Sequence, residues 1–492
     1  MHLERDLPTL RRIHRQRVAA GAARDTIDDS TWSDLDLDEL LADVDHCHSV
    51  LGQLTLCEWL RAPAQTLEEL QVRERRLEPE PMLRAGLLER LRRFPPLLAE
   101  TLWEAKQLPT LGALPTVLAS IAVAAHLLFL ISTQVGFLAM LSAFLVNMAF
   151  HFWSQPRIEA AVASLEFISV LLLAGQTLLT RANGRPSTRT LRVAALMKQL
   201  RPLRRAVAQV TVPPVLDDFP AEHLRILYQT RQRRLSRSAR LIEEHRAALI
   251  ELIALLGELD ASASVADYKA KRATCVPQLK PESSPLELTL ARHPSVPNAV
   301  ANSLTLSGGV VITGSNMSGK STFLRTVAVN ALLAQSLGLA CAASYRGPLL
   351  RIATSLRNGD RLSMGESTYF AEAKRMRELL ALTGSSNPLL LLVDEPFRGT
   401  NSAERIAAGA AVLRYAREQG ALVLAATHDL ELSQLLSETF DQAHFLDVVS
   451  DGGLSFDYRL RPGLVGPRNA VKLLEAMGYP ASVIAEAKRL LG

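Results

Sequence analysis

The hydrophobic pattern of the chain changes three times between its first and last residues. At the start, apolar side chains at helical spacing alternate with many charges, but no Asp, Glu, Lys or Arg stands between Lys106 and Arg157. Beyond that gap the charged helical pattern returns, and the last part alternates short apolar runs with helical stretches. We therefore expect four parts: a helical region over 1–110, an apolar hairpin over 111–156, a second helical region over 157–280 and an α/β domain over 281–492.

The uncharged stretch contains two apolar segments, which begin at Pro115 and Phe137 and are each about 17 residues long. Each approaches the ~20 residues that cross a hydrocarbon layer about 30 Å thick, and aromatic residues lie near the ends of the pair. Basic residues stand outside the pair, so we predict that residues 115–153 form a transmembrane hairpin in the lipid bilayer with both ends in the cytoplasm. The alternative is a buried helical hairpin of a soluble protein, which the polar residues His126 and Asn147 favour.

The helical region after the hairpin carries no visible catalytic motif. Glu159 and Glu166 interrupt the apolar pattern from Ile158 to Leu179, which favours a core helix over a third membrane span. A long helical stretch is expected from Ala221 to Leu259. Arginines in its first half could bind nucleic-acid phosphates, although a charge run on a helix is more often a solvated face. These arginines are Arg231, Arg233, Arg234, Arg237 and Arg240.

Continuous apolar runs mark the strands of the last part. The clearest are Val310–Thr313, Leu389–Val393 and Ala421–Ala426, separated by helical stretches. Strands of this kind are typical of a parallel sheet that is covered on both faces. The predicted fold is therefore a doubly wound α/β sheet preceded by an all-α region that carries the hairpin.

The first of these strands runs into a sequence of the form G-x-x-x-x-G-K-S. Such a loop turns its backbone N–H groups around phosphates, and the helix behind it presents its positive end to the anion. Lys320 would reach the β- and γ-phosphates of ATP, and the Ser321 hydroxyl would bind Mg²⁺. The predicted nucleotide-binding residues are Gly314, Ser315, Asn316, Met317, Ser318, Gly319, Lys320, Ser321 and Thr322.

Acidic and imidazole side chains follow the two other strands. Asp394 and Glu395 end one strand, where Asp394 would hold Mg²⁺ and Glu395 would accept a proton from the attacking water. His428 follows the neighbouring strand and could sense the γ-phosphate. The plainer alternatives are helix capping by the two acids and a loop histidine that is satisfied by backbone.

A second hydroxyl-rich sequence, Leu362 to Thr368, precedes another helical run. Because one chain's glycine loop already surrounds its own nucleotide, Ser367 at this helix start is free to contact the γ-phosphate bound by a partner chain. ATP would then lie between the two chains of a dimer. An ordinary N-cap is the alternative.

Charge, cysteine spacing and the N-terminal residues limit the possible partners, cross-links and targeting signals. The net charge of +5 permits a nucleic-acid or anionic-lipid partner without requiring one. The four cysteines form no C-x-x-C pair, so they provide neither a disulfide framework nor a zinc site. The N-terminus is charged throughout and does not resemble a signal peptide.

Taken together, these motifs resemble the MutS family of DNA mismatch-repair ATPases. TGSNMSGKSTFLR, GESTYFAEAKRM, VDEPFRGTNSAER and ATHDLELSQL are similar to the family's ATPase motifs, and ARHPSVPN to the segment before them. The resemblance implies an ABC-like P-loop ATPase fold, a homodimer that encloses ATP and Mg²⁺, and Pro297 and Asn298 near the adenine. HSVLGQLTLCEWLRAP and LGELDASASVADYKAK resemble the two ends of the family's core and lever domain, and NAVKLLEAMGYPASVIAEAKRLL its C-terminal dimerisation segment.

The chain also departs from the family pattern. It begins with core-like sequence, so we expect no counterpart of the mismatch-reading and connector domains, and Phe370-Ala371-Glu372 matches the family's Phe-x-Glu wedge only by letters. The resemblance implies DNA binding and a repair role, which these departures leave open. We expect a membrane-tethered MutS-like ATPase at the cytoplasmic membrane, or alternatively a nucleotide-switched membrane scaffold that acts on a protein or lipid without binding DNA.

Overall fold

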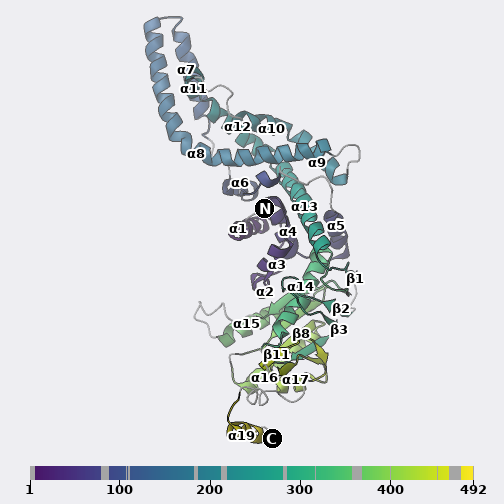
Figure 1. Ribbon diagram of the computed structural model, residues 1–492. Coiled ribbons are helices and arrows are strands. Elements are labelled where there is room, and N and C mark those ends of the chain that lie inside the picture. Colours follow the sequence, from purple (N-terminus) through teal and green to yellow (C-terminus); the bar gives the residue numbers. More distant parts are fainter. Residues whose placement is uncertain are drawn as a thin grey trace. The chain divides into compact units, whose positions relative to one another are not determined.

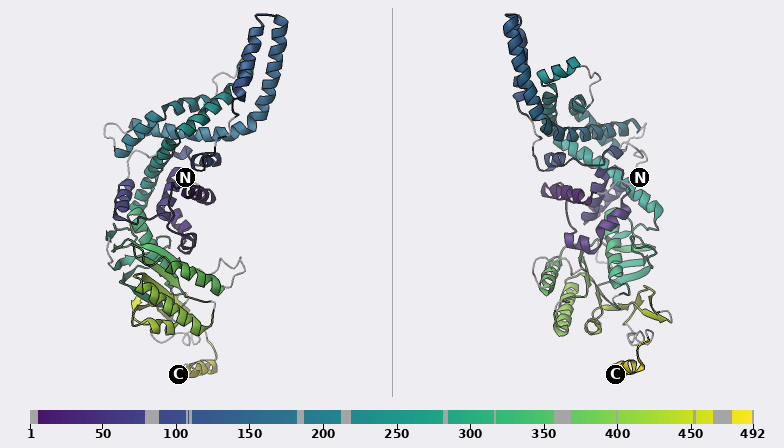
Figure 2. Two further views of the ribbon diagram at one scale, coloured as in Figure 1. Left: turned by 180° about the vertical axis from the view of Figure 1, so that it is seen from behind. Right: turned by 60° about the vertical axis from the view of Figure 1, so that its left-hand side comes forward.

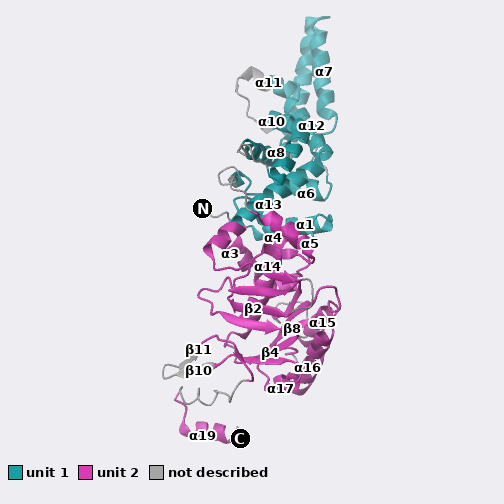
Figure 3. Cartoon of the chain, turned by 90° about the vertical axis from the view of Figure 1, so that its right-hand side faces the viewer, with its two compact units in different colours: residues 1–24, 46–57, 79–264 teal, residues 25–45, 58–78, 265–492 magenta. Residues whose placement is uncertain are grey.

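The structure is a computed structural model that describes residues 6–78, 88–106, 108, 111–181, 187–211, 219–280, 285–315, 317–356, 368–398, 400–450, 453–464 and 478–490 (Figure 1). The chain forms two compact units, and neither is one continuous stretch (Figure 3). Unit 1 consists of residues 1–24, 46–57 and 79–264. Unit 2 consists of residues 25–45, 58–78 and 265–492.

Unit 1 is helical, as the charged helical pattern predicts. Its longest helix is α8, which runs for 49 residues and includes both the second apolar segment and the expected core helix. Pro156 lies inside α8 and removes one backbone hydrogen bond, which accounts for the change of direction along this helix in Figure 1. The helices with residues in unit 1 are α1 (Leu7–Ala19), α4 (Val50–Arg61), α6 (Pro96–Trp103), α7 (Leu114–Leu128), α8 (Thr133–Arg181), α9 (Thr188–Gln199), α10 (Arg201–Thr211), α11 (Phe219–Leu227), α12 (Thr230–Glu244) and α13 (Arg246–Lys271), with a short 3-10 turn at Leu88–Arg90.

The second part of α8 lies in the core of unit 1. Ile158, Leu165, Leu171 and Leu178 are buried and pack with apolar residues of α9, α10 and α13. By length and composition alone, Thr133–Pro156 and Ala161–Thr180 could each cross a membrane, but half of the second window is buried inside the protein and only 22% of the first. The expectation of a core helix beyond the hairpin therefore agrees with the structure.

The stretch from Ala221 to Leu259 is helical, as expected, but it is divided into separate helices. The structure has three helices there, α11, α12 and α13, with breaks at Tyr228–Gln229 and at His245. Gln229 adopts a left-handed backbone conformation (φ 48°), and its buried amide donates to the backbone oxygen of Asn147 in α8, 2.8 Å away. This tertiary bond leaves no trace in the helical periodicity of the sequence.

The two segments that resemble the ends of the family's core domain meet inside unit 1. The Asp260 carboxylate in α13 accepts hydrogen bonds from the backbone N–H groups of His48 (3.0 Å) and Ser49 (2.8 Å) and from the Ser49 hydroxyl (2.6 Å). Burial raises the pKa of Asp260, and these hydrogen bonds oppose the rise. Gly52 and Gly257 let α4 and α13 approach closely, since a Cβ on either would lie 2.4 Å from an oxygen atom of the other helix.

Unit 2 contains a six-stranded sheet of order β12-β9-β4-β8-β7-β6, in which all neighbours are parallel except β12 and β9. The predicted strands appear as β4, β7 and β8, each buried along its whole length. One face packs against α15, α16 and α17, while α14 contacts strands of this sheet and β2 of a second sheet. The elements are β4 (Gly309–Thr313), α14 (Lys320–Leu337), β6 (Arg351–Ser355), α15 (Thr368–Leu380), β7 (Leu389–Asp394), α16 (Ser402–Glu418), β8 (Leu422–Thr427), α17 (Leu430–Leu436), β9 (Asp441–His444) and β12 (Arg461–Pro462).

The second sheet has the order β1-β5-β2-β3, and early segments of the chain complete the unit. Its strands are β1 (Gln278–Lys280), β2 (Leu286–Ala291), β3 (Asn302–Leu306) and β5 (Ser344–Pro348), and a separate hairpin is formed by β10 (Asp447–Ser450) and β11 (Gly453–Phe456). The early helices are α2 (Asp29–Asp34), α3 (Leu37–Val44) and α5 (Leu67–Leu77), of which α2 contacts β6 and α5 contacts α14 (Figure 3). The C-terminal helix is α19 (Ala481–Leu490).

Candidate functional site

The glycine loop, residues 314–321, connects β4 to α14. Gly314 (φ 147°) and Gly319 (φ 99°) adopt backbone angles that residues with a Cβ rarely adopt. A Cβ at Gly314 would also lie 2.7 Å from Ser318 Oγ, and one at Gly319 would lie 3.0 Å from the ring of Tyr458. The Ser318 hydroxyl donates to the backbone oxygen of Ser315 at 2.8 Å and closes the loop on itself. Both glycines are therefore required by the shape of the loop.

Lys320 lies at the start of α14 with its side chain inside the loop. It is buried, and its Nζ donates to the backbone oxygens of Gly314 and Ser315, both 2.7 Å away. The ammonium group and the N-terminus of an 18-residue helix thus place positive charge at the same point, as anion binding requires. Met317 and Thr322 are exposed, and Asn316 lies outside the described residues.

A hydroxyl and a carboxylate meet beside the loop. The Ser321 hydroxyl donates to Asp394 Oδ2 at the carboxyl end of β7. Burial raises the pKa of Asp394, the hydrogen bond from Ser321 opposes this, and the guanidinium of Arg398 lies 4.0 Å from Oδ1. A buried carboxylate next to a hydroxyl offers the hard oxygen ligands that Mg²⁺ prefers.

Glu395 and His428 form a second pair on adjacent strands. Glu395 Oε1 accepts from the backbone N–H of His428 (3.0 Å) and lies 2.6 Å from its Nδ1, while Oε2 accepts from the Thr427 hydroxyl at 3.2 Å. Glu395 is buried, whereas half of the imidazole is exposed. Glu395 has a positive φ of 54°, and its backbone N–H donates to the backbone oxygen of Ala426 at 2.9 Å, which stabilises this conformation. A carboxylate and an imidazole in contact can exchange a proton at the mouth of the site.

Glu395, His428 and Asp429 have side-chain ligand atoms within 4.8 Å of one another, a spacing that could hold a metal ion. Asp429 is already paired with Arg405, whose Nη2 lies 2.8 Å from one carboxylate oxygen and 3.0 Å from the other. The charge of Asp429 is therefore balanced by that of Arg405.

Glu372 supports the candidate site, a role that the sequence did not predict. Its buried carboxylate, on α15, accepts from the backbone N–H groups of Phe397 (2.6 Å) and Arg398 (3.0 Å). Since Phe397 and Arg398 lie two and three residues after Glu395, Glu372 fixes the loop that follows both acids. An acid among the apolar positions of an amphipathic helix is the signal that could have identified it.

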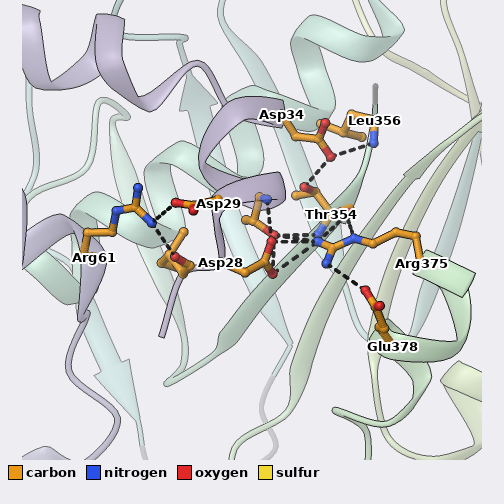
Figure 4. A network of polar contacts seen from close by, with 10 residues as sticks. Asp28, Asp29, Asp34, Arg61, Thr354, Leu356, Arg375 and Glu378 are labelled. Carbon is orange, nitrogen blue, oxygen red and sulfur yellow. Dashed lines mark hydrogen bonds and ion pairs between the residues drawn. The ribbon is translucent and has the colours of Figure 1, made fainter. Parts of the chain in front are cut away.

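A polar network connects α2 to the end of β6 within unit 2 (Figure 4). Asp34 Oδ2 accepts from the Thr354 hydroxyl (2.7 Å) and from the Leu356 N–H (2.9 Å). Arg375 of α15 donates to Asp28 at 3.1 Å and to the Thr354 oxygen at 3.0 Å. The network thus holds both flanks of residues 357–367. Ser367 belongs to that segment and lies outside the described residues.

Pro297 and Asn298 lie on the exposed loop between β2 and β3, and Asn298 has a left-handed backbone conformation (φ 55°). Among the described residues, no hydrogen bond or ion pair joins either of them to the glycine loop. Their contact with the adenine stays a prediction.

The ends of three adjacent strands, β4, β8 and β7, therefore bring together the glycine loop, His428 and the two acids. This arrangement defines a mainly parallel α/β domain with a glycine loop, a buried lysine and a hydroxyl–carboxylate pair at one sheet edge. Comparison with known proteins identifies it further, because residues 310–492 match the family model of MutS domain V. Residues 310–492 are thus identified as a MutS domain V, which confirms the resemblance seen in the motifs.

Curated relatives agree with this assignment. The chain is 33% identical over 249 residues to the DNA mismatch repair protein MutS of Thermus thermophilus, a match covering 50% of this chain and 30% of the relative. It is 33% identical over 266 residues to the DNA mismatch repair protein MutS of Chloroflexus aurantiacus, covering 51% and 27%. It is 32% identical over 267 residues to the DNA mismatch repair protein MutS 2 of Haloarcula marismortui, covering 48% and 28%. The matches thus span less than a third of each relative.

Proposed function

We propose that the protein is a membrane-tethered MutS-like ATPase, in which ATP binding and hydrolysis drive the opening and closing of a homodimer. The observation that carries this proposal is the convergence of Lys320, the Ser321–Asp394 pair and the Glu395–His428 pair at the ends of β4, β7 and β8. Members of the MutS family are ATPases, and the match to domain V covers this part of the chain.

The residues present fit ATP and Mg²⁺. The loop offers backbone N–H groups, a buried ammonium group and a helix N-terminus to the phosphates, and Ser321 and Asp394 would hold the cation. When bound, Mg²⁺ neutralises phosphate charge. Asp394 favours this role because burial raises its pKa, so a cation would relieve the cost of keeping its carboxylate ionised.

Proton transfer is assigned to Glu395. Its carboxylate would take a proton from the attacking water. Its Oε1 lies 2.6 Å from His428 Nδ1, within hydrogen-bond distance. The half-exposed imidazole would then sense the γ-phosphate and release the carboxylate when phosphate is bound. Glu372 positions Glu395 through the loop that follows it.

The dimer follows from the proposed role of Ser367. Its hydroxyl would contact the γ-phosphate held by the partner subunit, so that ATP closes the dimer and hydrolysis opens it. The C-terminal segment would add to the dimer contact. The polar network around Asp34 and Arg375 supports this role, because it holds the residues on either side of 357–367.

Membrane and DNA contacts complete the proposal. Residues 115–153 would anchor the protein in the cytoplasmic membrane, with the ATPase domain in the cytoplasm. DNA binding and a mismatch-repair role come from the family, and the names of the curated relatives support them. The arginines of α12 are a candidate DNA contact, since Arg233, Arg237 and Arg240 are exposed.

The test is ATP hydrolysis by the detergent-solubilised protein and its Glu395→Gln variant, with Glu431→Gln on the exposed side of α17 as the matched control. We expect Glu395→Gln to bind ATP and dimerise but to lose turnover by about 100-fold or more. Unchanged hydrolysis would contradict the assignment of Glu395. Running the wild type without DNA, with matched duplex and with mismatched duplex at one salt concentration identifies any DNA that stimulates it.

A second candidate is a nucleotide-switched membrane scaffold that acts on a protein or lipid partner. The apolar hairpin favours it, because an anchor restricts the protein to the membrane surface. ATP hydrolysis that is indifferent to every DNA, together with an inactive Glu395→Gln variant, would support the scaffold.

A further inference from the structure

The apolar surface of the α7–α8 hairpin extends along both helices, from the turn to the base. The window Thr133–Pro156 has 24 residues, or about 36 Å at 1.5 Å per residue, which exceeds the hydrocarbon thickness of about 30 Å. Figure 2 shows the hairpin projecting beyond the remaining helices of unit 1 in both views. Its exposed large apolar residues include Leu114, Val117, Ile121, Leu130, Leu138, Leu145, Phe152 and Trp153. The surface of a bilayer around this hairpin would therefore lie near its base.

Two exposed aromatic side chains mark the base of the apolar surface on α8. Phe152 is 65% exposed and Trp153 is 56% exposed. The chain becomes charged again directly beyond them, at Arg157 and Glu159. Because tryptophan favours the boundary between hydrocarbon and headgroups, the headgroup layer would lie at the level of Trp153.

Helix α12 meets the hairpin at this same level. The amide nitrogen of Gln232, in the first turn of α12, lies 3.1 Å from His151 Nδ1 and 3.5 Å from Ser154 Oγ. These two residues flank Phe152 and Trp153 in the sequence. Gln232 is fully buried, and α12 contacts α7 as well as α8. Figure 1 shows α12 and the hairpin on the same side of the second part of α8. The start of α12 is therefore fixed beside the expected headgroup layer.

Arginines follow Gln232 on the exposed side of α12. Arg233, Arg234 and Arg237 are exposed, whereas the apolar residues between them are buried in the core of unit 1. Arg234 Nη1 donates to the backbone oxygen of Gln209 at 3.2 Å, a bond that leaves its positive charge unbalanced. This face of α12 thus offers guanidinium groups to anionic oxygen atoms.

The charges of α12 are sorted by distance from the hairpin. Residues 230–242 include no acid, and Glu243 and Glu244 are the last two residues of the helix. Among the ion pairs between described residues, α12 contributes one, at this far end, where Arg240 Nε lies 2.9 Å from Glu244 Oε1. Arg237 follows Gln232 by five residues, or about 8 Å along the helix, which is about one Debye length at physiological salt. The arginines nearest the hairpin therefore act on the headgroup layer with no acid to oppose them on their own helix.

We propose that Arg233, Arg234 and Arg237 bind the headgroups of anionic phospholipids around the base of the hairpin, so that the anchor prefers anionic over zwitterionic lipid. The inference rests on the proposed membrane anchor and adds a lipid class to it. Arg233 and Arg237 also belong to the candidate DNA contact, and both partners offer phosphate oxygens. Their position beside Trp153 favours the lipid, because headgroups around the anchor would already occupy this surface.

The test uses the fluorescence of Trp153 in the full-length protein. Trp32, Trp59 and Trp103 are each at most 4% exposed, so bromine atoms on acyl chains, which quench on contact, report on Trp153. The protein is reconstituted into vesicles of brominated phosphatidylcholine. Unbrominated phosphatidylglycerol or phosphatidylcholine then replaces this lipid in steps. The relief of quenching measures which of the two lipids is preferred beside Trp153.

We expect the wild type to favour phosphatidylglycerol about fivefold at low salt, with the preference falling as salt is added. The double variant Arg233→Gln/Arg237→Gln should lose most of this preference. The matched control, Arg12→Gln/Arg15→Gln, removes the same charge from exposed positions of α1, which lies on the other side of α8 from α12 (Figure 1), and should keep the preference. Quenching by brominated phosphatidylcholine shows that each variant still folds and inserts.

The outcomes separate this inference from the anchor on which it rests. Equal affinity of the wild type for the two lipids, or a preference that the α12 double variant keeps, would overturn the lipid site while quenching leaves the anchor in place. Absence of quenching in the wild type would contradict the anchor itself and the lipid site with it. A double variant that keeps the lipid preference but loses salt-dependent binding of a DNA duplex would assign these arginines to nucleic acid instead.

Discussion

Asp34 and Thr354 are 320 residues apart in the sequence, yet the Asp34 carboxylate accepts the Thr354 hydroxyl at 2.7 Å in a buried position of unit 2. The same oxygen accepts the Leu356 N–H at 2.9 Å. The carboxylate of Asp34 in α2 therefore holds Thr354 and Leu356, at the end of β6 and directly before residues 357–367. Its contribution to stability and to ATP hydrolysis can be measured separately.

We predict that Asp34→Ala destabilises the protein by about 2–3 kcal/mol, because it leaves the Thr354 hydroxyl and the Leu356 N–H buried without their acceptor. Denaturant unfolding measures this loss. Asp441→Ala, at an exposed position of β9, is the control and should change the free energy of unfolding little. A variant as stable as the control would show that the two donors find other partners.

The buried carboxylate of Asp394 gives a prediction with opposite signs for stability and activity. Burial raises the pKa of Asp394, so the folded state binds the proton more tightly than the unfolded chain, and stability falls as the pH rises from the unfolded pKa of 3.8 through the folded value. Asp394→Asn should therefore unfold at a higher temperature than the wild type at neutral pH without nucleotide. It should also lose Mg²⁺-dependent ATP hydrolysis by roughly 100-fold or more.

Thermal unfolding with and without Mg²⁺ and ATP checks both halves of this prediction. The wild type should gain stability when both are added, by mass action, and Asp394→Asn should gain less. An Asp394→Asn protein that is less stable than the wild type would mean that the Ser321 hydrogen bond outweighs the burial cost of the charge.

His293 supplies a prediction on acid sensitivity. The pKa of His293 is lowered from 6.5 to about 4. Burial is the main cause and the positive charge of Arg325 the second, while the negative charge of Asp36 acts in the opposite direction. The unfolded chain binds this proton first, so stability is lost as the pH falls through the window between 6.5 and about 4, by up to about 3 kcal/mol. The uncharged His293→Asn variant should lose less stability across this window, since an amide oxygen can replace Nδ1 as the acceptor of the Ser295 N–H. Denaturant unfolding at the two ends of the window measures the difference, and equal losses would refute it.

The part of the fold that was predictable from sequence is the part that local pattern specifies. Continuous apolar runs predicted β4, β7 and β8 to within one residue at each end, because a strand covered on both faces has no polar positions. The glycine loop was equally readable, since its two glycines are required by backbone angles. The site was anticipated wherever a polar residue directly follows such a strand.

The remaining features depend on tertiary contacts that no local pattern records. Glu372 acts on a loop 25 residues away, and the break at Gln229 depends on a backbone oxygen of a different helix. The amphipathic pattern of α2, α3 and α5 predicts which face of each helix is buried. It does not predict which unit that face packs against. Periodicity identifies an apolar face, and only the three-dimensional structure identifies its partner.

The interleaving of the two units has a consequence for protein synthesis. Residues 25–45 and 58–78 leave the ribosome early, but the remainder of unit 2 begins only at Val265. At about 5–20 residues per second, Asp34 waits roughly 15–60 s for Thr354 and Leu356 to be made. During that time the apolar faces of these early helices have no native partner, so nascent chains of this protein should depend on chaperones more than chains whose units are continuous.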